Sequence, residues 1–336
     1  MSKRKMNWKN LKNNFTKRMI QLFYHNTGPS VLNVFTTNRC NFSCSYCSRN
    51  ISDNSQGKEN RYKDISEFKF DDLKILLSRY PTINEVAFVG IGEPFMLPHI
   101  ADLAEYAKKC GKKTTVITNG TLLHNFRDRL SDAFDVISIS LHGFSADELS
   151  QISRVSKETF SILTENIKEA VELSQKNRSF ILKASVVLNK TLMKRAHTAA
   201  EFCCEHGIAE LDLHNYLPYG LDDKEQCIFD DDDEWKALFK ELTKEFENKL
   251  KINPPILIKR DKSKMKWNCI SFFRVLRVDG LGQVSGCNCI MIPKKENGDW
   301  KEDNNVWNNI YFSEMRQRFK ERKEIPECCR YCGQAQ

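Results

Sequence analysis

Short runs of apolar residues alternate with longer amphipathic segments along the chain from residue 31 onward. The short runs are rich in β-branched or large apolar residues, which is typical of buried strands. Six of them are predicted to be strands: Val31–Thr36, Glu85–Val89, Thr114–Thr118, Val136–Leu141, Phe180–Leu188 and Glu210–Tyr216.

The segments between these runs carry apolar residues at helical spacing. The clearest period runs through Phe160, Leu163 and Ile167. Strand–helix alternation favours parallel strands joined by right-handed crossovers. We therefore predict the α/β class and a partial (β/α)6 TIM-like barrel, with its chemistry at the C-terminal ends of the strands. Helices are predicted at Phe70–Tyr80, Ile100–Cys110, Leu122–Leu130, Lys157–Lys176 and Leu192–His206.

The pattern changes after Tyr216. The acidic run Asp230–Glu234 precedes a helix near Trp235, where a solvated cap is a simpler explanation than a metal site. Asn253-Pro254-Pro255 breaks the chain, and the basic stretch Lys259–Lys266 leads to a cysteine-rich tail. The predicted organisation is a basic N-terminal extension (1–30), a barrel (31–250) and a small cysteine-rich domain (251–336).

The composition limits the cellular compartment and the binding partners that we expect. The net charge is +8, and residues 1–52 contain nine Lys or Arg and no Asp or Glu. A solvated basic leader with a short amphipathic helix explains this segment, so nucleic acid is not an expected partner. No stretch approaches the roughly 20 apolar residues of a membrane span, and the N-terminus is too polar for a secretory signal. We therefore predict a cytoplasmic protein, in which 13 clustered cysteines indicate metal binding or redox chemistry.

The first cysteine cluster has the spacing CxxxCxxC over Cys40, Cys44 and Cys47. The residues between them are mostly polar, so a loop around a metal fits better than a helix face that buries small thiols. Thiolates select zinc or iron–sulfur clusters, and structural zinc sites usually take four ligands. Three thiolates on a four-iron cluster leave one iron open, which is what a catalytic metal needs.

This segment resembles the radical S-adenosylmethionine superfamily, whose hallmark is CxxxCxxC with an aromatic residue, here Tyr46, before the last cysteine. The resemblance covers residues 31 to about 216, and a zinc module is the alternative. It implies that a 4Fe–4S cluster passes an electron to S-adenosylmethionine, yielding methionine and a 5′-deoxyadenosyl radical that removes a hydrogen atom from a substrate. The basic balance suits an acidic flavodoxin- or ferredoxin-type electron donor.

Two further motifs strengthen the resemblance. Gly90-Ile91-Gly92-Glu93-Pro94 ends the second strand and is similar to the family's Gly-Gly-Glu-Pro element, with Ile91 replacing a glycine. In the family this segment contacts the amino group of the cofactor, and glycine allows the backbone to approach it. Thr118-Asn119-Gly120 after the third strand is similar to the family's Thr-Asn-Gly.

The fourth and fifth strands supply the remaining candidates. Ser140 matches a serine that lies near the cofactor in the family, and His142 replaces the usual acid, either as a proton acceptor or as a structural histidine. Lys183 and Ser185 alternate to one side of the fifth strand and either meet the cofactor or lie on a half-exposed face. The predicted cofactor-binding residues are therefore Tyr46, Gly92, Glu93, Pro94, Asn119, Ser140, Lys183 and Ser185.

The cysteine-rich tail resembles the twitch domain, the shortened form of the SPASM extension. The resemblance implies one auxiliary 4Fe–4S cluster on Cys269, Cys287, Cys329 and Cys332, with Cys328 as an alternative to Cys329. Four thiolates close this second cluster, so it is not expected to bind S-adenosylmethionine. A zinc ribbon is the alternative.

The resemblance also bears on the reaction. Twitch-bearing relatives oxidise or epimerise sugar or aminocyclitol compounds, which favours a small polar substrate of sugar, aminocyclitol or nucleotide type. A maturase that modifies a peptide or protein ranks second, because no leader-binding domain is expected before Val31, and a non-enzymatic iron–sulfur or zinc regulatory module ranks third. Epimerisation is slightly preferred over dehydrogenation, because the spare thiols Cys204, Cys227 and Cys289 are candidates to return a hydrogen atom.

Overall fold

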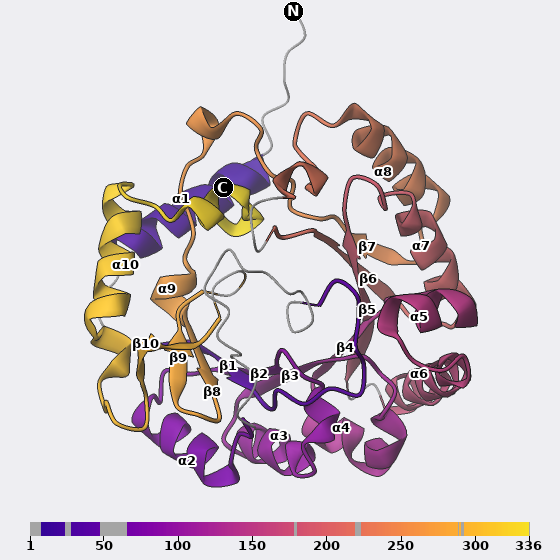
Figure 1. Cartoon of the computed structure of the whole chain (residues 1–336), viewed down its shortest axis with the longest axis horizontal. Helices are drawn as coiled ribbons and strands as arrows, with labels where there is room; N and C mark the ends of the chain where they lie inside the picture. Colours follow the sequence, from indigo (N-terminus) through magenta and orange to yellow (C-terminus); the bar gives the residue numbers. More distant parts are fainter. Residues whose placement is uncertain are drawn as a thin grey trace, which may run out of the picture.

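A single open sheet of ten strands forms the centre of the molecule (Figure 1). The computed structural model describes residues 8–23, 28–47, 66–177, 180–218, 223–287, 289 and 292–335. The strand order is β10-β9-β8-β1-β2-β3-β4-β5-β6-β7, so β7 and β10 are unclosed edges. The strands are β1 (Val31–Phe35), β2 (Glu85–Val89), β3 (Lys113–Thr118), β4 (Val136–Ser140), β5 (Ile181–Leu188), β6 (Glu210–Asn215), β7 (Lys251–Asn253), β8 (Val275–Asp279), β9 (Gln283–Ser285) and β10 (Lys294–Asp299).

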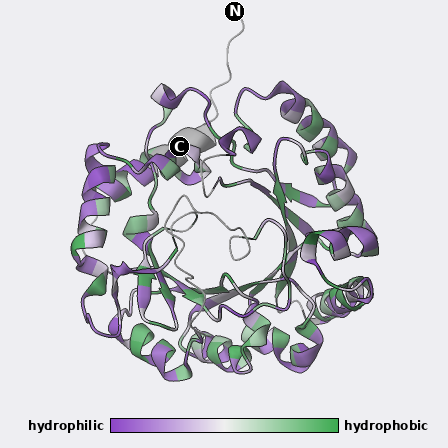
Figure 2. Cartoon of the chain, viewed as in Figure 1, coloured by the Kyte–Doolittle hydropathy of each residue, from purple (hydrophilic) through white to green (hydrophobic). Residues whose placement is uncertain are grey.

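Helices surround the outside of this curved sheet (Figure 1). Hydrophobic residues run along the strands, whereas the helices are mixed in character, as expected of elements with one face in the core (Figure 2). The α-helices are α1 (Trp8–Phe23), α2 (Phe70–Arg79), α3 (Ile100–Lys109), α4 (Leu130–Ala133), α5 (Ala146–Ser153), α6 (Glu158–Asn177), α7 (Arg195–Glu205), α8 (Asp233–Glu245), α9 (Ser271–Arg274) and α10 (Ile310–Glu321).

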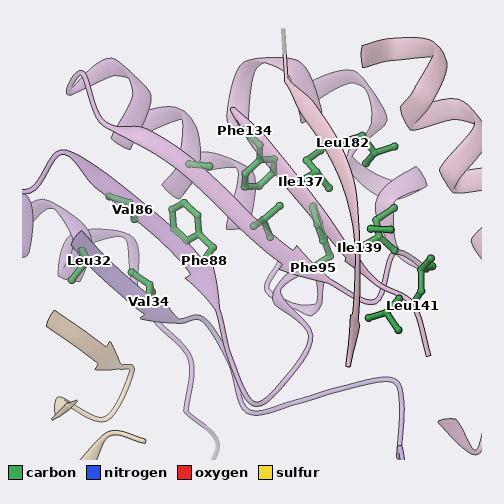
Figure 3. Packing of buried hydrophobic residues seen from close by; sticks show 14 of the residues in the cluster. Leu32, Val34, Val86, Phe88, Phe95, Phe134, Ile137, Ile139, Leu141 and Leu182 are labelled. Carbon is green, nitrogen blue, oxygen red and sulfur yellow. The ribbon is translucent and has the colours of Figure 1, made fainter. Parts of the chain in front are cut away.

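The two faces of each strand differ in chemistry. On β5, Leu182, Ala184 and Val186 are buried, while Lys183 and Ser185 point to the other side and are only half-buried. The buried set faces the helices and packs with side chains from the neighbouring strands, as Figure 3 shows for Ile137, Ile139 and Leu182. The polar set therefore lines the concave inner face of the barrel, where a ligand has access.

All six predicted strands are present within one residue of their expected bounds, and two more parallel strands extend the barrel. β7 pairs with β6, and β8 pairs with β1, with Val31 opposite Val275. The C-terminal segment is therefore joined to the barrel through a continuous sheet. The predicted helix at Leu122–Leu130 is instead a 3-10 segment, Leu123–Arg129, that leads into α4, and α5 was not predicted.

The predicted N-terminal amphipathic helix is present as α1 and packs on the C-terminal segment. The buried Gln21 side chain donates hydrogen bonds to the backbone carbonyls of Trp267 and Cys269, at 2.7 and 2.9 Å. Arg18 donates to the carbonyl of Lys320 at the end of α10. Among the described residues, no helix combines the length and the apolar character that crossing a membrane requires.

Candidate active site and auxiliary cysteine cavity

The first cysteine cluster lies on the loop that follows β1, at the C-terminal ends of the parallel strands. Cys44 is buried, and Cys40 and Cys47 are half-buried. The segment is a loop with one turn, as its polar composition predicted, so its three thiols do not share a helix face. Below, Thr37–Cys47 is called the cysteine loop.

Gly92 is the first anchor of the cysteine loop. A Cβ atom on Gly92 would lie 2.2 Å from the carbonyl oxygen of Arg39 and 2.4 Å from that of Thr37. The next residue, Glu93, donates its backbone N–H to the Arg39 carbonyl at 2.8 Å. The cysteine loop itself is therefore a backbone that approaches Gly92 closely, and the close approach of a ligand at this glycine stays a prediction.

A polar network forms the second anchor. Asn119, after β3, donates its amide to the Oδ1 of Asn41 at 2.8 Å, and Asn41 donates to the hydroxyl of Thr121 at 2.8 Å. The Thr121 hydroxyl donates back to the Oδ1 of Asn119 at 2.7 Å. Because these side chains satisfy one another, Asn41 is fixed between Cys40 and Cys44.

Helix α5 is the third anchor. Ser43 and Ser45 donate their backbone N–H groups to the carbonyls of Ser153 and Ile152 at the C-terminal end of α5, at 3.0 and 2.9 Å. The Cys44 thiol also contacts the Ser153 hydroxyl at 3.6 Å. α5 begins at the cap Ser145, whose hydroxyl accepts from the N–H of Glu148. A short, capped helix that the sequence pattern did not reveal therefore holds the middle of the cysteine loop.

Glu93 is buried under this assembly. Its carboxylate accepts hydrogen bonds from the Thr118 hydroxyl, the Asn119 N–H and the Phe95 N–H, at 2.7, 2.7 and 3.1 Å. Burial raises the pKa of Glu93 to about 7, although the three hydrogen bonds favour the ionised form. Pro94 begins a short 3-10 turn directly after it. Glu93 therefore links the ends of β2 and β3, and its neighbours Gly92 and Asn119 both hold the cysteine loop.

His142 lies beside the cysteine loop. Its Nδ1 is hydrogen-bonded to the Tyr46 hydroxyl, and its carbonyl accepts from Arg195 of α7 at 3.0 Å. Arg195 also forms an ion pair with Glu148 at 2.5 Å. Burial, aided by the charge of Arg195, lowers the pKa of His142 to about 4, so the imidazole is neutral at physiological pH. The environment of His142 combines a structural hydrogen bond with a neutral ring that can accept a proton.

The other predicted cofactor residues share the inner face of the barrel. Ser140 on β4 is opposite Ser185 on β5 in the sheet register. Lys183 lies two residues before Ser185 on β5, opposite Ser138. The Lys183 ammonium pairs with the Asp212 carboxylate of β6 at 2.5 Å, and Asp212 also accepts from Asn253 of β7 at 2.6 Å. This row crosses four strands, so the sheet brings these residues together although they are far apart in sequence.

Sequence reasoning missed two members of this inner face. His214 follows Asp212 by two positions on β6, and Leu211 and Leu213, which alternate with them on the other face, are buried. Its side chain is exposed within the barrel, and the surrounding wall lowers its pKa through desolvation. The alternation that singled out Lys183 and Ser185 on β5 also identifies Asp212 and His214 on β6.

The second cysteine cluster surrounds an enclosed cavity. Six thiols line it, together with the aromatic rings of Phe272 and Phe319; they belong to Cys269, Cys287, Cys289, Cys328, Cys329 and Cys332. The Cys289 thiol is hydrogen-bonded to Cys332, and the Cys328 thiol to Cys329. All four predicted ligands are therefore in one place, together with Cys328, the predicted alternative to Cys329, and the spare thiol Cys289.

The three spare thiols occupy different places. Cys204 is half-buried on α7, which packs on the outer side of β5 and β6. Cys227 is fully buried with Phe229 and Ile258, and burial raises the pKa of its thiol to about 12. Cys289 lines the C-terminal cavity. The structure does not bring these three thiols together on the inner face.

The donor chemistry of both cysteine regions fits iron–sulfur clusters. Among the described residues, no three His, Cys, Asp or Glu side chains converge on a single ion. Cluster ligands need not converge in this way, because each thiolate of a four-iron cluster binds a different iron. The cysteine loop offers three thiols beside an open inner face, and the C-terminal cavity offers six around an enclosed volume.

Comparisons with known proteins agree with this geometry. The model of the family described as "Radical SAM superfamily" matches residues 34–199. A tungsten-containing aldehyde ferredoxin oxidoreductase cofactor-modifying protein of Pyrococcus furiosus is 26% identical over 65% of this chain and 60% of its own length. A probable GTP 3′,8-cyclase of Metallosphaera sedula is 30% identical over 56% of each chain. This chain thus spans less than two thirds of either relative.

A solved structure shares the fold. Streptococcus suis SuiB bound to S-adenosylmethionine superposes with a TM-score of 0.65 at 15% identity, over 100% of this chain and 76% of that chain. This likeness extends beyond the barrel to the C-terminal segment. At this identity, the superposition shows the architecture alone.

Proposed function

Because this chain belongs to the radical S-adenosylmethionine superfamily, we propose that it uses the radical to oxidise a small polar substrate. The enzymatic cleavage of S-adenosylmethionine, the substrate class and the oxidative outcome are all parts of this proposal. The observation that carries it is the inner face, where Lys183, Asp212 and His214 offer charge and proton acceptance. Of the spare thiols, Cys204 lies on α7 and Cys289 in the C-terminal cavity, and Cys227 is fully buried beside Tyr216 at the end of β6.

The cysteine loop and its anchors position the cofactors. When bound, a 4Fe–4S cluster on Cys40, Cys44 and Cys47 and S-adenosylmethionine supply the radical that removes a hydrogen atom from the substrate. Gly92, Glu93 and Asn119 hold the cysteine loop against the ends of β2 and β3, so they fix where that radical arises. Ser140 and Ser185 lie at the same end of the inner face and are our candidates for contacts with S-adenosylmethionine.

The polar residues of β5 and β6 on the inner face suit a polar substrate, with His214 two positions nearer the C-terminal ends of the strands than Asp212. Lys183, held by Asp212, offers an ammonium group for a hydroxyl or a phosphate, and Asn253 fixes the carboxylate from the other side. His214 has a lowered pKa, so its neutral imidazole is ready to accept the proton that an oxidised C–OH group must lose. We therefore assign binding to Lys183 and Asp212, and proton removal to His214.

The C-terminal cavity completes the oxidation. A substrate radical that loses a proton must also lose one electron to become a carbonyl compound. We propose that the six-thiol cavity holds an auxiliary 4Fe–4S cluster that accepts this electron, with Cys269, Cys287, Cys329 and Cys332 as ligands. Cys289 and Cys328 line the same cavity, so each lies where it can replace one of these four ligands.

The substrate class follows from the charge of the inner face and from one relative. A sugar, an aminocyclitol or a nucleotide presents the hydroxyl and phosphate groups that Lys183 and Asp212 bind. The similarity to a probable GTP 3′,8-cyclase supports our choice of nucleotides as the first of these to test. A redox-neutral epimerisation needs a hydrogen-donating thiol beside the substrate, and Cys227, the spare thiol at the end of β6, is fully buried there.

The test is turnover in deuterated water. Reduced anaerobic enzyme is incubated with nucleoside phosphates and sugar phosphates, and 5′-deoxyadenosine formation above the substrate-free rate identifies a substrate. The proposal predicts a product two hydrogens lighter, formed equally by Cys204→Ala and Cys227→Ala and about 10²-fold more slowly by His214→Gln. A product of unchanged mass that carries solvent deuterium, lost in one of the cysteine variants, would establish epimerisation instead.

A further inference from the structure

The outward face of α1 carries apolar side chains that the fold does not cover. Phe15, Met19 and Leu22 are spaced one helical turn apart and are 67%, 38% and 48% exposed. Gln21, on another side of the same helix, is fully buried against the C-terminal segment. The helix is therefore docked on one side and presents a stripe of three apolar residues on the other.

Positive charge predominates on α1 and on the stretch that adjoins its docked side. Lys17 and Arg18 lie within α1, which has no acidic residue, and the described like-charged neighbour of Arg18 is Arg322. The basic stretch Lys259–Lys266 adjoins, with Lys266 directly before Trp267, whose carbonyl accepts from Gln21. Asp261 is the acid within that stretch, and it pairs with Lys264. We call Phe15, Met19 and Leu22 with Lys17, Lys264 and Lys266 the α1 surface, and leave out Arg18, whose guanidinium donates to Gln21 and to the Lys320 carbonyl.

The α1 surface lies directly over the C-terminal cysteine cavity. Gln21 donates to the carbonyl of Cys269, so a single helix, roughly 10 Å across, separates the surface from this cavity residue. Lys262 donates to the carbonyl of Arg330, between Cys329 and Cys332, and its ammonium lies 4.2 Å from the centre of the Tyr331 ring. The basic stretch is therefore attached to the segment that carries two of the proposed cluster ligands.

We propose that the α1 surface is the docking site of an acidic one-electron carrier protein, with a flavin or an iron–sulfur centre, that exchanges electrons with the auxiliary cluster. A small apolar centre with a basic rim is complementary to a carrier with an acidic rim around its cofactor, and opposite charges steer such transient encounters. In one exchange the carrier is oxidised by one electron and the cluster is reduced by one, or the reverse, and no bond is made or broken. This inference rests on the proposed auxiliary cluster.

The charge of the surface favours a protein carrier over two other occupants. A second copy of the chain would place basic surface against basic surface, which is repulsive. An anionic membrane would also attract the charges, and it remains an outcome of the test because a basic amphipathic helix is a typical lipid-binding element. The position over a six-thiol cavity is what selects the carrier, since a membrane contact has no need of a redox centre beneath it.

The experiment compares two pairs of charge reversals. Lys264→Glu with Lys266→Glu alters the α1 surface, and Lys109→Glu with Lys249→Glu reverses two exposed charges elsewhere as the matched control. Binding of a bacterial flavodoxin to anaerobically reconstituted full-length protein is measured by titration at 50, 150 and 300 mM salt, alongside phosphatidylserine vesicles. Iron content and dithionite-driven cleavage of S-adenosylmethionine serve as controls of integrity.

The proposal predicts that the α1 surface pair weakens flavodoxin binding at least tenfold at the lowest salt and flattens its salt dependence, while the control pair changes it less than twofold. Phe15→Ser with Met19→Ser should weaken binding without changing the salt slope. Equal effects of both charge pairs, no effect of either, or loss of vesicle binding without loss of flavodoxin binding would overturn it. If the double variant Cys269→Ala with Cys329→Ala keeps the full iron content, the proposed auxiliary cluster is wrong. The binding data still decide whether the α1 surface is the docking site.

Discussion

The two cysteine regions of this molecule are built in opposite ways. The cysteine loop carries three thiols and is held from outside by Gly92, Asn119 and the end of α5. The C-terminal region carries six thiols that form the wall of an enclosed cavity. Anchoring from outside leaves the thiols of the loop facing an open barrel, whereas the cavity encloses whatever it holds.

In the function that we propose, this difference separates a site for chemistry from a site that stores an electron. Three ligands leave a coordination position for a substrate or cofactor, and the open inner face brings Ser140, Lys183 and Asp212 within the same barrel. Four or more ligands satisfy every iron of a cluster, and Phe272 and Phe319 add apolar surface to the cavity wall. We therefore expect that mutations can disable each of the two regions without disabling the other.

The largest effect is expected from the cysteine loop. Cys40→Ala, Cys44→Ala and Cys47→Ala should each reduce 5′-deoxyadenosine formation by more than about 10³-fold, because each removes one of only three anchors of the cluster that supplies the radical. Activity is measured with anaerobically reconstituted, dithionite-reduced protein. Cys110→Ala, which changes an exposed cysteine, is the control and should keep full activity. Full cleavage by any of the three loop variants would remove the basis of the proposed mechanism.

A large but separate effect is expected from the cavity. The triple variant of Cys269, Cys329 and Cys332 to Ala should bind about four fewer irons than the eight expected of two four-iron clusters. Cleavage of S-adenosylmethionine without substrate should persist within about threefold, while oxidised product disappears. Iron analysis and product mass spectrometry measure the two effects. If this variant loses the iron of both regions and also the cleavage activity, the two regions are not independent.

Gly92→Val sharpens the role of the external anchors. A side chain at this position meets the carbonyls of Arg39 and Thr37, so we expect the cysteine loop to shift and the iron bound there to fall severalfold. Gly90→Ala is the matched control, because its Cβ would lie 3.4 Å from the Thr37 carbonyl, a tolerable contact. If Gly92→Val instead weakens S-adenosylmethionine binding and leaves the iron content normal, the glycine is needed for the approach of the ligand and not of the cysteine loop.

The smallest effect concerns Glu93 and pH. The pKa of this buried carboxyl rises from 4.5 to about 7, so the folded protein binds a proton more readily than the unfolded chain. Stability from this group is therefore present below about pH 4.5 and is lost as pH rises to about 7, by an amount on the order of 3 kcal/mol. Thermal unfolding at pH 5.5 and 7.5 should show this trend in wild type and a weaker one in Glu93→Gln. Parallel pH trends would contradict the assignment.

The local pattern of apolar residues was enough to predict the barrel strands, because each strand packs against helices on one side and faces the interior of the barrel on the other. The same pattern does not reveal pairing between distant segments. Nothing local in Val275–Asp279 indicates that it lies parallel to β1, so the continuity of the C-terminal segment with the barrel emerged from the structure. α5 escaped prediction because eight residues hold only two helical turns, too few for a clear period.

The candidate site shows the same division. Cysteine spacing identified the loop thiols, and the structure gathers the four predicted tail ligands around one cavity. The partners of the motifs were beyond reach, because Asn41, Ser153 and Arg195 act through contacts between residues far apart in sequence. Asp212 and His214 were within reach, since they alternate on β6 as Lys183 and Ser185 do on β5.

The most direct test of the central claim is the electron paramagnetic resonance spectrum of reduced protein with and without S-adenosylmethionine. It is recorded for two variants, one with Cys40, Cys44 and Cys47 changed to Ala and one with Cys269, Cys329 and Cys332 changed to Ala. An open site on the cysteine loop and a closed site in the cavity predict that S-adenosylmethionine alters the signal of the second variant and leaves that of the first unchanged. A signal that responds to S-adenosylmethionine in the variant without the loop cysteines would contradict the account.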